Sequence, residues 1–250
     1  MSDSVLTVKI RHRVGMVPLD VDFALTQPWT VLFGPSGSGK TTVLRAIAGF
    51  VRLEAGRIAR EDLVMADSAT GVFVPAHLRP VRSAAQAAWL FPHLTVMRNI
   101  LYGCGRKSEG TDQVQAADEV MALFRLEQLS ERLPRALSGG ERQRVSVARA
   151  VVSAVTFQGP GKALLLLDEP FSGLDVTLRD ELLANLRGWL VRWNIPVLSV
   201  THDVGEAFQL GAEVIKIADG KVVDQGQVSD ALAGERRLLM DQLSRGSFKI

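Results

Sequence analysis

The sequence predicts an α/β fold: a parallel sheet covered by helices, with an antiparallel part at the N-terminus and a helical insertion. Residues 29–49 have the pattern of a short apolar strand, a glycine-rich loop and a helix. Residues 163–167 and 196–200 are continuous apolar runs, as expected for strands covered on both faces. Strand signals fade over 86–137, where apolar side chains recur at helical spacing. Together these observations predict parallel strands with helical crossovers, interrupted by a block of helices.

Composition places the chain among globular proteins that bury one core. It has 250 residues, of which 47% are hydrophobic, and its formal net charge of +2 is too small to indicate nucleic-acid binding. Cys104 is the only cysteine, which excludes an internal disulfide and favours a reducing compartment. The N-terminus lacks a signal-peptide pattern, and the longest apolar stretch, 150–157, is too short for a membrane helix. We therefore expect a soluble protein that contacts a membrane only through a partner.

The N-terminal segments show the alternation of half-buried strands. Apolar and polar side chains alternate over 6–10 and again over 17–25. We expect these segments to pair as two antiparallel strands before the glycine-rich loop. Residues 57–81 give no clear assignment, although 69–80 have the composition of a loop.

The glycine-rich loop matches the phosphate-loop pattern G-x-x-x-x-G-K-[ST], in the strand–loop–helix context that this motif requires. Its glycines let backbone N–H groups turn inward around a polyphosphate, and the N-terminus of the next helix adds a partial positive charge. Lys40 is predicted to contact the outer phosphates, and the Thr41 hydroxyl is predicted to ligate Mg²⁺. The predicted nucleotide-phosphate site comprises Gly34, Pro35, Ser36, Gly37, Ser38, Gly39, Lys40, Thr41 and Thr42.

The rest of the chain continues the pattern of helices and strands. Apolar side chains over 114–124 recur at helical spacing and predict an amphipathic helix. Leucines recur every four residues over 178–190, between the two apolar runs, and complete a strand–helix–strand crossover. Asp219-Gly220, between the apolar segments 214–217 and 221–223, is a strong hairpin signal.

Asp168 and Glu169 directly follow the apolar run 163–167. Both carboxylates therefore stand at the carboxyl end of a predicted strand, where open parallel sheets bind their ligands. Asp168 is suited to hold Mg²⁺, and Glu169 is suited to orient and deprotonate an attacking water. An ordinary acidic loop is the alternative, and the phosphate loop earlier in the chain favours the catalytic interpretation.

The pattern of residues 138–141 is consistent with two roles, a helix cap and an anion-binding site. Ser138 and Glu141 match the S-x-x-E capping box, which starts a helix. Gly139 and Gly140 leave the N–H groups of that helix's first turn bare and available to an anion. Because the phosphate loop already surrounds one nucleotide, a second phosphate-seeking element makes sense if it closes over the nucleotide of another subunit.

The set of motifs resembles that of the ATPase subunits of ABC transporters. Residues Ser138-Gly139-Gly140-Glu141-Arg142-Gln143 are similar to the signature motif of that family. The resemblance covers nearly the whole chain. Its motifs come in the order of the family: the phosphate loop, Gln86 before Leu90-Phe91-Pro92, the signature, Leu164 to Glu169, Ser172-Gly173-Leu174-Asp175 and Thr201-His202-Asp203.

This resemblance implies a P-loop NTPase (RecA-like) core with an N-terminal antiparallel β subdomain and an inserted α-helical subdomain. One ABC ATPase domain would span residues 1–250, with its core at 1–86 and 150–250 and the helical insertion at about 87–149. It also implies a head-to-tail homodimer that holds two ATP molecules between the phosphate loop of one copy and the signature motif of the other.

The resemblance further implies a role for each motif residue. Across the dimer, Ser138, Gly139, Gly140 and Glu141 would act on the partner's ATP, and Asp175 would cross the dimer seam. Gln86 would reach Mg²⁺ and the attacking water, and His202 would contact the γ-phosphate. The implied catalytic residues are Glu169, His202, Gln86 and Lys40, and the implied Mg²⁺ ligands are Thr41, Gln86 and Asp168.

Within the family, the segment Leu90 to Val96 followed by Asn99-Ile100 is similar to importer ATPases. Pro92-His93 and Arg132-Leu133-Pro134 look most like the molybdate-type oxyanion branch. The resemblance implies a peripheral subunit at the cytoplasmic face of the inner (plasma) membrane that drives integral membrane permease subunits and is served indirectly by a solute-binding protein. Many such ATPases carry a C-terminal β regulatory domain, and because the sequence stops at Ile250 we expect none here.

Two other functions remain open as alternatives. A non-transport ABC ATPase acting on nucleic acid or ribosomes would need long coiled coils or two ATPase units, and this sequence offers neither. A nucleotide-binding scaffold without hydrolysis is the other alternative, against which intact Glu169, His202 and Lys40 argue. We therefore expect ATP, a second copy of the chain and a permease as partners, and no nucleic acid.

The chain departs from the family pattern in two places. The family commonly stacks adenine on an aromatic side chain near residues 13–15, where this sequence has none, which leaves His12 or Arg13 as the stacking group. Residues 83–85, Ser-Ala-Ala, replace bulkier apolar residues and predict looser packing before Gln86. The apolar side chains over 90–101 are expected either to form the core of the helical insertion or to line a groove for a permease helix.

Overall fold

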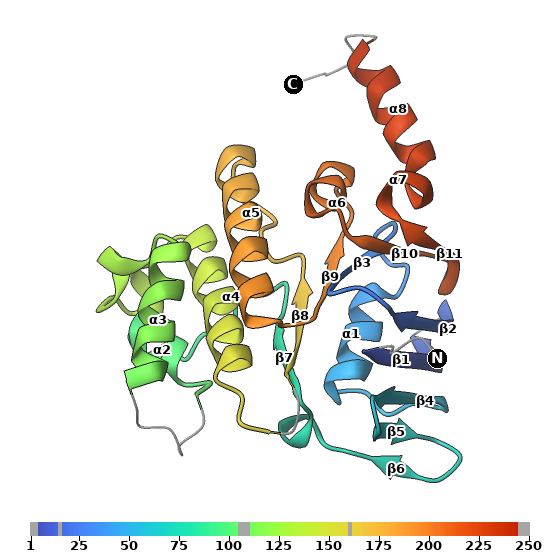
Figure 1. The fold of residues 1–250 in the computed structure, drawn as a ribbon, viewed down its shortest axis with the longest axis horizontal. Coiled ribbons are helices and arrows are strands. Elements are labelled where there is room, and N and C mark those ends of the chain that lie inside the picture. The colour runs from blue at the N-terminus through green and yellow to red at the C-terminus, as the bar shows by residue number, and fades with distance from the viewer. Residues whose placement is uncertain (1–4, 15–16, 105–110, 160–161, 245–250) are drawn as a thin grey trace.

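The computed structural model of the protein describes residues 5–14, 17–104, 111–159 and 162–244. Within these residues the strands form one sheet in the order β6-β5-β4-β1-β2-β11-β10-β3-β9-β8-β7. Helices cover both faces of its parallel part, and a group of helices lies beyond one end (Figure 1). The predicted α/β fold class, with an antiparallel N-terminal part and inserted helices, is confirmed.

The parallel part of the sheet contains the strands that the apolar runs predict. Their register is parallel from each strand to the next. Every residue of β3, β8 and β9 is buried, because helices cover both faces. The strands are β10 (Glu213–Ala218), β3 (Trp29–Phe33), β9 (Val197–Thr201), β8 (Leu164–Asp168) and β7 (Val81–Ala84).

Strand alternation divides the core into two layers. On β8, Leu164 and Leu166 pack into one cluster with α1, whereas Leu165 and Leu167 pack into the other with α4 and α5. Three helices of the two layers are α1 (Lys40–Ala48), α4 (Gly139–Val155) and α5 (Val176–Trp193). The short helix α6 (Val204–Leu210) follows β9 on the α5 side. The predicted crossover of strand, leucine-rich helix and strand is thus present as β8, α5 and β9.

The antiparallel part extends the sheet beyond β11. The strands β1 (Leu6–Val14) and β2 (Val17–Leu25) pair as predicted. The hairpin predicted at Asp219-Gly220 is also present, with φ of 48° and 73° at its two turn residues, and it joins β10 to β11 (Lys221–Gln227).

Residues 69–80 are not simply a loop, and that expectation was wrong in part. They contain β6 (Val72–Phe73), which pairs with β5 (Leu63–Asp67), and a 3₁₀ turn at Ala76–Leu78. β4 (Ala55–Arg60) joins this hairpin to β1. A two-residue edge strand is too short to show alternation in a sequence, so the pattern gave no signal for it.

Arg79 joins the β5–β6 hairpin to α1, the helix that follows the phosphate loop, by hydrogen bonds. The side chain is fully buried and donates to the carbonyls of Ala46 and Ile47 at 2.8 Å each, where α1 ends. It also donates to the carbonyls of Val74 and Met65. Burial lowers the pKa of Arg79 to about 10, so the guanidinium stays charged at neutral pH. This cation satisfies carbonyl groups that the end of a helix leaves free.

The inserted helices lie beyond α4 (Figure 1). They comprise α2 (Val96–Leu101), α3 (Thr111–Leu123) and the 3₁₀ turns Glu127–Leu129 and Pro134–Ala136. At the C-terminus, α7 (Val228–Ala231) leads into α8 (Ala233–Ser244), which points away from the sheet. No helix among the described residues has both the length and the apolar character that a membrane crossing needs. The division into a core at 1–86 and 150–250 and an insertion at about 87–149 remains a prediction.

Candidate nucleotide-binding site

The phosphate loop joins β3 to α1, as its sequence context predicts. Gly39 has φ of 100°, and a Cβ added there would lie 2.8 Å from Cδ1 of Leu19, so a residue with a side chain is disfavoured on both counts. Nζ of Lys40 donates to the carbonyls of Gly34 and Pro35 at 2.7 and 2.8 Å, which holds the ammonium inside the loop. Burial lowers the pKa of Lys40, and the nearby carboxylates Glu169 and Asp168 partly offset this effect.

A cavity of about 310 Å³ opens at this loop. It brings together most of the residues predicted for phosphate binding and catalysis, which come from four separate segments of the chain. Its lining consists of Leu19, Ser36, Gly37, Gly39, Lys40, Thr41, Thr42, Gln86, Glu169, Val200 and His202. The carboxyl ends of β8 and β9 therefore meet the phosphate loop, as the rule for ligand sites in parallel sheets predicts.

Glu169 is at the centre of the polar groups in this cavity. Nε2 of Gln86 donates to Oε2 of Glu169 at 2.9 Å, and Nδ1 of His202 lies 2.9 Å from Oε1 of the same carboxylate. Glu169 has φ of 46°, a left-handed conformation that is uncommon for a residue with a side chain and is often found at functional sites. Two side chains from distant parts of the sequence, Gln86 and His202, thus meet at one carboxylate, an arrangement that a general base could use.

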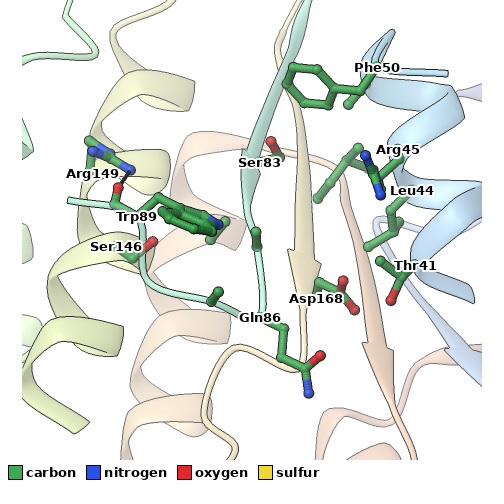
Figure 2. Close-up of a pocket in the computed structure, with 15 residues that line it drawn as sticks. Thr41, Leu44, Arg45, Phe50, Ser83, Gln86, Trp89, Ser146, Arg149 and Asp168 are labelled. Carbon is green, nitrogen blue, oxygen red and sulfur yellow. Dashed lines mark hydrogen bonds between the residues drawn. The ribbon is translucent and has the colours of Figure 1, made fainter. Parts of the chain in front are cut away.

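The residues predicted as Mg²⁺ ligands supply the oxygen atoms that Mg²⁺ prefers. Thr41 and Asp168 point toward one another (Figure 2). Burial raises the pKa of Asp168, which the Thr41 hydroxyl and the charge of Lys40 partly offset. The described residues contain no cluster of three or more His, Cys, Asp or Glu side chains suited to a metal ion. A hydroxyl and one carboxylate, with Gln86 nearby, instead fit an ion that shares its ligands with phosphates and water.

The signature residues form the predicted capping box at the start of α4. Ser138 Oγ accepts from the N–H of Glu141 at 3.2 Å, and Oε2 of Glu141 accepts from the N–H of Ser138 at 2.7 Å. The hydrogen bond from the Ser138 backbone lowers the pKa of Glu141. A Cβ on Gly140 would lie 2.6 Å from Cδ2 of Leu174, so the bare first turn of α4 lies against the segment before Asp175. In the described part of the chain, residues 138–141 and Asp175 do not line the cavity at the phosphate loop.

Comparison with known proteins identifies the family. The ABC transporter family profile matches residues 19–172, more than half of the chain. The chain belongs to the ABC transporter family. The resemblance predicted from the motifs is therefore confirmed.

The relatives with curated names include molybdenum import ATP-binding proteins. This ABC chain is 40% identical over 229 residues to molybdenum import ATP-binding protein ModC 1 of Azotobacter vinelandii, covering 90% of this chain and 61% of that protein. It is 42% identical over 226 residues to molybdenum import ATP-binding protein ModC of Rhodopseudomonas palustris, covering 89% and 57%. The chain thus spans about three fifths of the length of these relatives.

Solved structures of ABC proteins share the fold. One is cbiO1 from Clostridium perfringens, part of the ABC transporter complex cbiONQ, with a TM-score of 0.75 and 21% identity over 96% of this chain and 95% of that chain. Another is the dimeric bacterial ABC transporter cassette MJ0796, with a TM-score of 0.73 and 23% identity over 89% and 98%. At this level of identity the likeness shows the ABC fold.

A second, larger cavity adjoins the first. It has a volume of about 740 Å³ and lies between α1, the segment after β7 and α4 (Figure 2). Its lining includes the small residues 83–85, so it lies where the sequence predicts loose packing. Phe50 and Trp89 border it and are 63% and 76% exposed. Gln86 and Thr41 line both cavities.

The apolar residues 90–101 belong mainly to the core of the inserted helices. Val96 and Ile100 are fully buried, and Leu90, Met97 and Leu101 pack against the same cluster. The exposed aromatic side chains at the larger cavity come instead from Phe50 and Trp89. The structure therefore favours the core interpretation for Val96, Ile100 and the side chains packed with them, although Leu90 and Phe91 also line a cavity of about 420 Å³. A groove for a permease helix remains a prediction.

The residues considered for adenine stacking lie at the end of β1. His12 is half-buried, with Nδ1 3.6 Å from Oε1 of Glu54, and Arg13 is exposed. Gly15, the last residue of the segment considered, lies outside the described residues. A role for His12 or Arg13 in stacking adenine remains a prediction.

Sequence reasoning missed Leu19, Val200 and Glu206. Val200 was within an apolar run whose carboxyl end points to the site, so its position offered a signal. Leu19 and Glu206 gave none, because one lies in an ordinary alternating strand and the other looks like a surface acid on a helix. Glu206 is buried and accepts a hydrogen bond of 2.9 Å from the hydroxyl of Thr201, next to His202. Its Oε1 has no partner among the described residues, and burial raises the pKa of Glu206 to about 7.

We expect Glu206→Gln to weaken the pH dependence of the free energy of unfolding. The folded pKa of about 7 lies above the ordinary value of 4.5, so the folded protein retains a proton that the unfolded chain releases, and stability falls as pH rises between these values. From about pH 5.5 to 8, the wild type should lose about 2 kcal/mol relative to the variant. Urea unfolding at both pH values measures this. Glu181→Gln, which changes an exposed acid, is the control, and equal pH slopes for wild type and Glu206→Gln would contradict the prediction.

Proposed function

We propose that this chain is the ATP-hydrolysing subunit of an ABC importer that takes up molybdate or a related oxyanion. The observation that carries the proposal is the convergence of Gln86, Glu169 and His202 beside the phosphate loop, with both Glu169 oxygens 2.9 Å from a neighbouring side chain. The solute class rests on the relatives, whose names are molybdenum import ATP-binding proteins. No finding favours the alternative of an ATPase that acts on nucleic acid or ribosomes.

In the proposed reaction, this chain's residues position the triphosphate and a water molecule. The N–H groups of residues 36–41 and the ammonium of Lys40 surround the phosphates and neutralise their charge. Glu169 accepts a proton from the water as the water oxygen attacks the γ-phosphorus, while the bond from that phosphorus to the β–γ bridging oxygen breaks and ADP leaves. His202 stabilises the carboxylate and contacts the γ-phosphate. Bound Mg²⁺, held by Thr41, Asp168 and Gln86, would supply further charge neutralisation.

The proposed site needs a second copy of the chain. Ser138, Gly139, Gly140 and Glu141 present a glycine-tipped helix N-terminus that lies outside the cavity of its own chain. A head-to-tail homodimer would bring this turn to the partner's γ-phosphate and place Asp175 at the seam. ATP would then hold two copies together, and hydrolysis would release them, which converts the reaction into rigid-body motion.

The larger cavity fits the proposed permease partner. It has exposed aromatic side chains at its rim, small side chains along one wall, and Gln86 at the boundary with the nucleotide cavity. A permease helix seated there would contact the segment that carries Gln86, so its motion and ATP hydrolysis would be coupled. We therefore place the protein at the cytoplasmic face of the inner membrane, as a peripheral subunit, with a solute-binding protein as an indirect partner.

Glu169→Gln is expected to lower ATP turnover by about 10²- to 10⁴-fold, the usual contribution of a general base. Binding of ATP should persist, because the substitution leaves the phosphate loop intact, and an ATP-dependent dimer should accumulate in size-exclusion chromatography. Glu181→Gln is the matched control, because this acid lies outside the cavity and pairs with Arg125. Turnover by Glu169→Gln equal to that of the control would exclude Glu169 as the base.

Trp89→Ala and Phe50→Glu are expected to release the permease while leaving basal ATP turnover unchanged. A buried aromatic anchor at an interface contributes about 2 kcal/mol or more, which corresponds to about a 30-fold loss of affinity. Co-purification of a hydrophobic membrane subunit from detergent extracts measures the effect. Leu78→Glu, which changes a side chain that is 65% exposed and absent from the cavity lining, is the control.

The same complex tests the solute. With permease-containing liposomes, molybdate and its solute-binding protein should stimulate ATP turnover by the added wild-type chain, whereas the Trp89→Ala chain, which does not hold the permease, should stay at its basal rate. If Trp89→Ala and Phe50→Glu both retain the permease, its docking surface lies outside the larger cavity. Stimulation by an unrelated sugar instead of molybdate would reject the oxyanion assignment while leaving the importer assignment intact.

A further inference from the structure

An ion pair joins α5 to the turn that carries His202. Nη1 of Arg179 donates to Oδ2 of Asp203 at 2.7 Å, and Nε of Arg179 donates to Oδ1 of Asp180 at 3.2 Å. The guanidinium side chain is only 18% exposed. Burial alone would lower the pKa of Arg179, but its two carboxylate partners outweigh this effect and raise it. The guanidinium therefore bridges a residue of its own helix and the residue that directly follows His202.

Asp203 uses its backbone and its whole carboxylate to fix that turn. Oδ1 of Asp203 accepts from the N–H of Glu206 at 3.0 Å, while Oδ2 accepts from Arg179. The N–H of Asp203 donates to the Thr201 hydroxyl at 3.0 Å, on the other side of His202. Burial alone would raise the pKa of Asp203, but these donors hold it below its ordinary value. Asp203, which follows His202, is thus bonded to the Thr201 hydroxyl before His202, to the Glu206 N–H after it, and to Arg179 of α5.

The other end of this connection is the segment between Glu169 and α5. α5 begins after Asp175, whose Oδ1 accepts from the N–H of Leu178 at 2.9 Å. The N–H of Arg179 donates to the carbonyl of Asp175 at 3.0 Å, so Arg179 lies one helical turn after the residue proposed at the dimer seam. Before Asp175, the hydroxyl of Ser172 donates to the carbonyl of Glu169 at 3.1 Å. Asp175, Glu169 and His202 therefore belong to segments that meet through short bonds, and Arg179 makes the direct link from α5 to the His202 turn.

We propose that Arg179 and Asp203 are positioning residues for ATP hydrolysis. Their ion pair holds the turn carrying His202 against the first turns of α5, and this keeps the imidazole at the 2.9 Å distance from Glu169 that the proposed reaction uses. The inference rests on the proposed function. Neither residue lines the cavity at the phosphate loop, so the pair acts on His202 and not on the nucleotide directly.

α5 and α6 are also joined by other hydrogen bonds, and one of them provides a control. Nη1 of Arg187 donates to the carbonyl of Gln209 at 3.3 Å, so Arg187 joins the same two helices two turns further from His202. A structural role in holding α6 against α5 would be shared by Arg179 and Arg187. The two arginines would differ only if Arg179, which is bonded to the residue after His202, also positions His202.

The test compares Arg179→Ala with Arg187→Ala in steady-state ATP hydrolysis. Arg179→Ala is expected to lower kcat by about 10- to 100-fold, because small displacements of a catalytic group have effects of this size. The KM for ATP should stay within about twofold of the wild-type value, since the phosphate loop is untouched. Arg187→Ala should keep the wild-type kcat. Equal loss of kcat in both variants, or no loss in Arg179→Ala, would overturn the proposal.

Two further variants keep the result interpretable if Arg179→Ala folds poorly. Arg179→Lys retains the charge but lacks the planar fork that reaches Asp180 and Asp203 together, so its kcat should lie between those of the wild type and Arg179→Ala. Asp203→Asn, which keeps an oxygen to accept from the N–H of Glu206, should lower kcat to a similar degree as Arg179→Ala. The double variant should be no slower than the slower single variant, because both remove the same interaction. Additive losses would overturn the proposal.

Dimer formation separates this inference from the proposed function. In the Glu169→Gln background, Arg179→Ala should leave the ATP-dependent dimer intact. If the wild type neither hydrolyses ATP nor dimerises with it, the proposed function fails. If the wild type does both and Arg179→Ala matches it, the positioning role alone fails.

Discussion

The Glu169 carboxylate, shared between Gln86 and His202 at 2.9 Å on each side, is the interaction on which the site depends. It is possible because β8 and β9 are adjacent parallel strands whose carboxyl ends meet the phosphate loop. The buried leucines of β8 pack into both layers of the core, so the strand that ends at Asp168 has little freedom to shift. The packing of the core thus also determines the position of the Glu169 carboxylate.

Gln86 and Thr41 connect the two cavities, because both line the nucleotide cavity and the larger cavity beside it. A partner seated in the larger cavity would contact the segment that also determines the Gln86–Glu169 hydrogen bond. The first turn of α4, residues 138–141 (the signature turn), behaves differently. Its capping box is complete within the chain, yet these residues do not line the cavity at the chain's own phosphate loop. The proposed dimer would therefore act at the cavity beside the phosphate loop and the proposed permease at the larger cavity, and Gln86 and Thr41 line both.

Sequence patterns predicted the parts of the molecule in which side-chain chemistry and periodicity agree. The phosphate loop, the strands ending at Asp168 and Thr201, and the capping box at Ser138 are of this kind. The β4–β6 region was not assigned, because Arg60 and Arg79 are buried there and donate to backbone carbonyls, whereas charged residues in a sequence usually indicate surface. Sequence patterns also gave no sign of the larger cavity, since Phe50 and Trp89 come from segments whose proximity no local pattern reveals.

The central claim is that the triphosphate cavity of one copy is completed by the signature turn of another. Two single-cysteine chains test it, Ser36→Cys and Ser138→Cys, each with Cys104 replaced by serine and with Glu169→Gln to slow turnover. Mixed with Mg²⁺ and ATP under mild oxidation, the two chain types should become joined by a disulfide between their introduced cysteines, and removal of ATP should abolish it. Failure of this pair to crosslink with ATP, while the chains still bind nucleotide, would contradict the account.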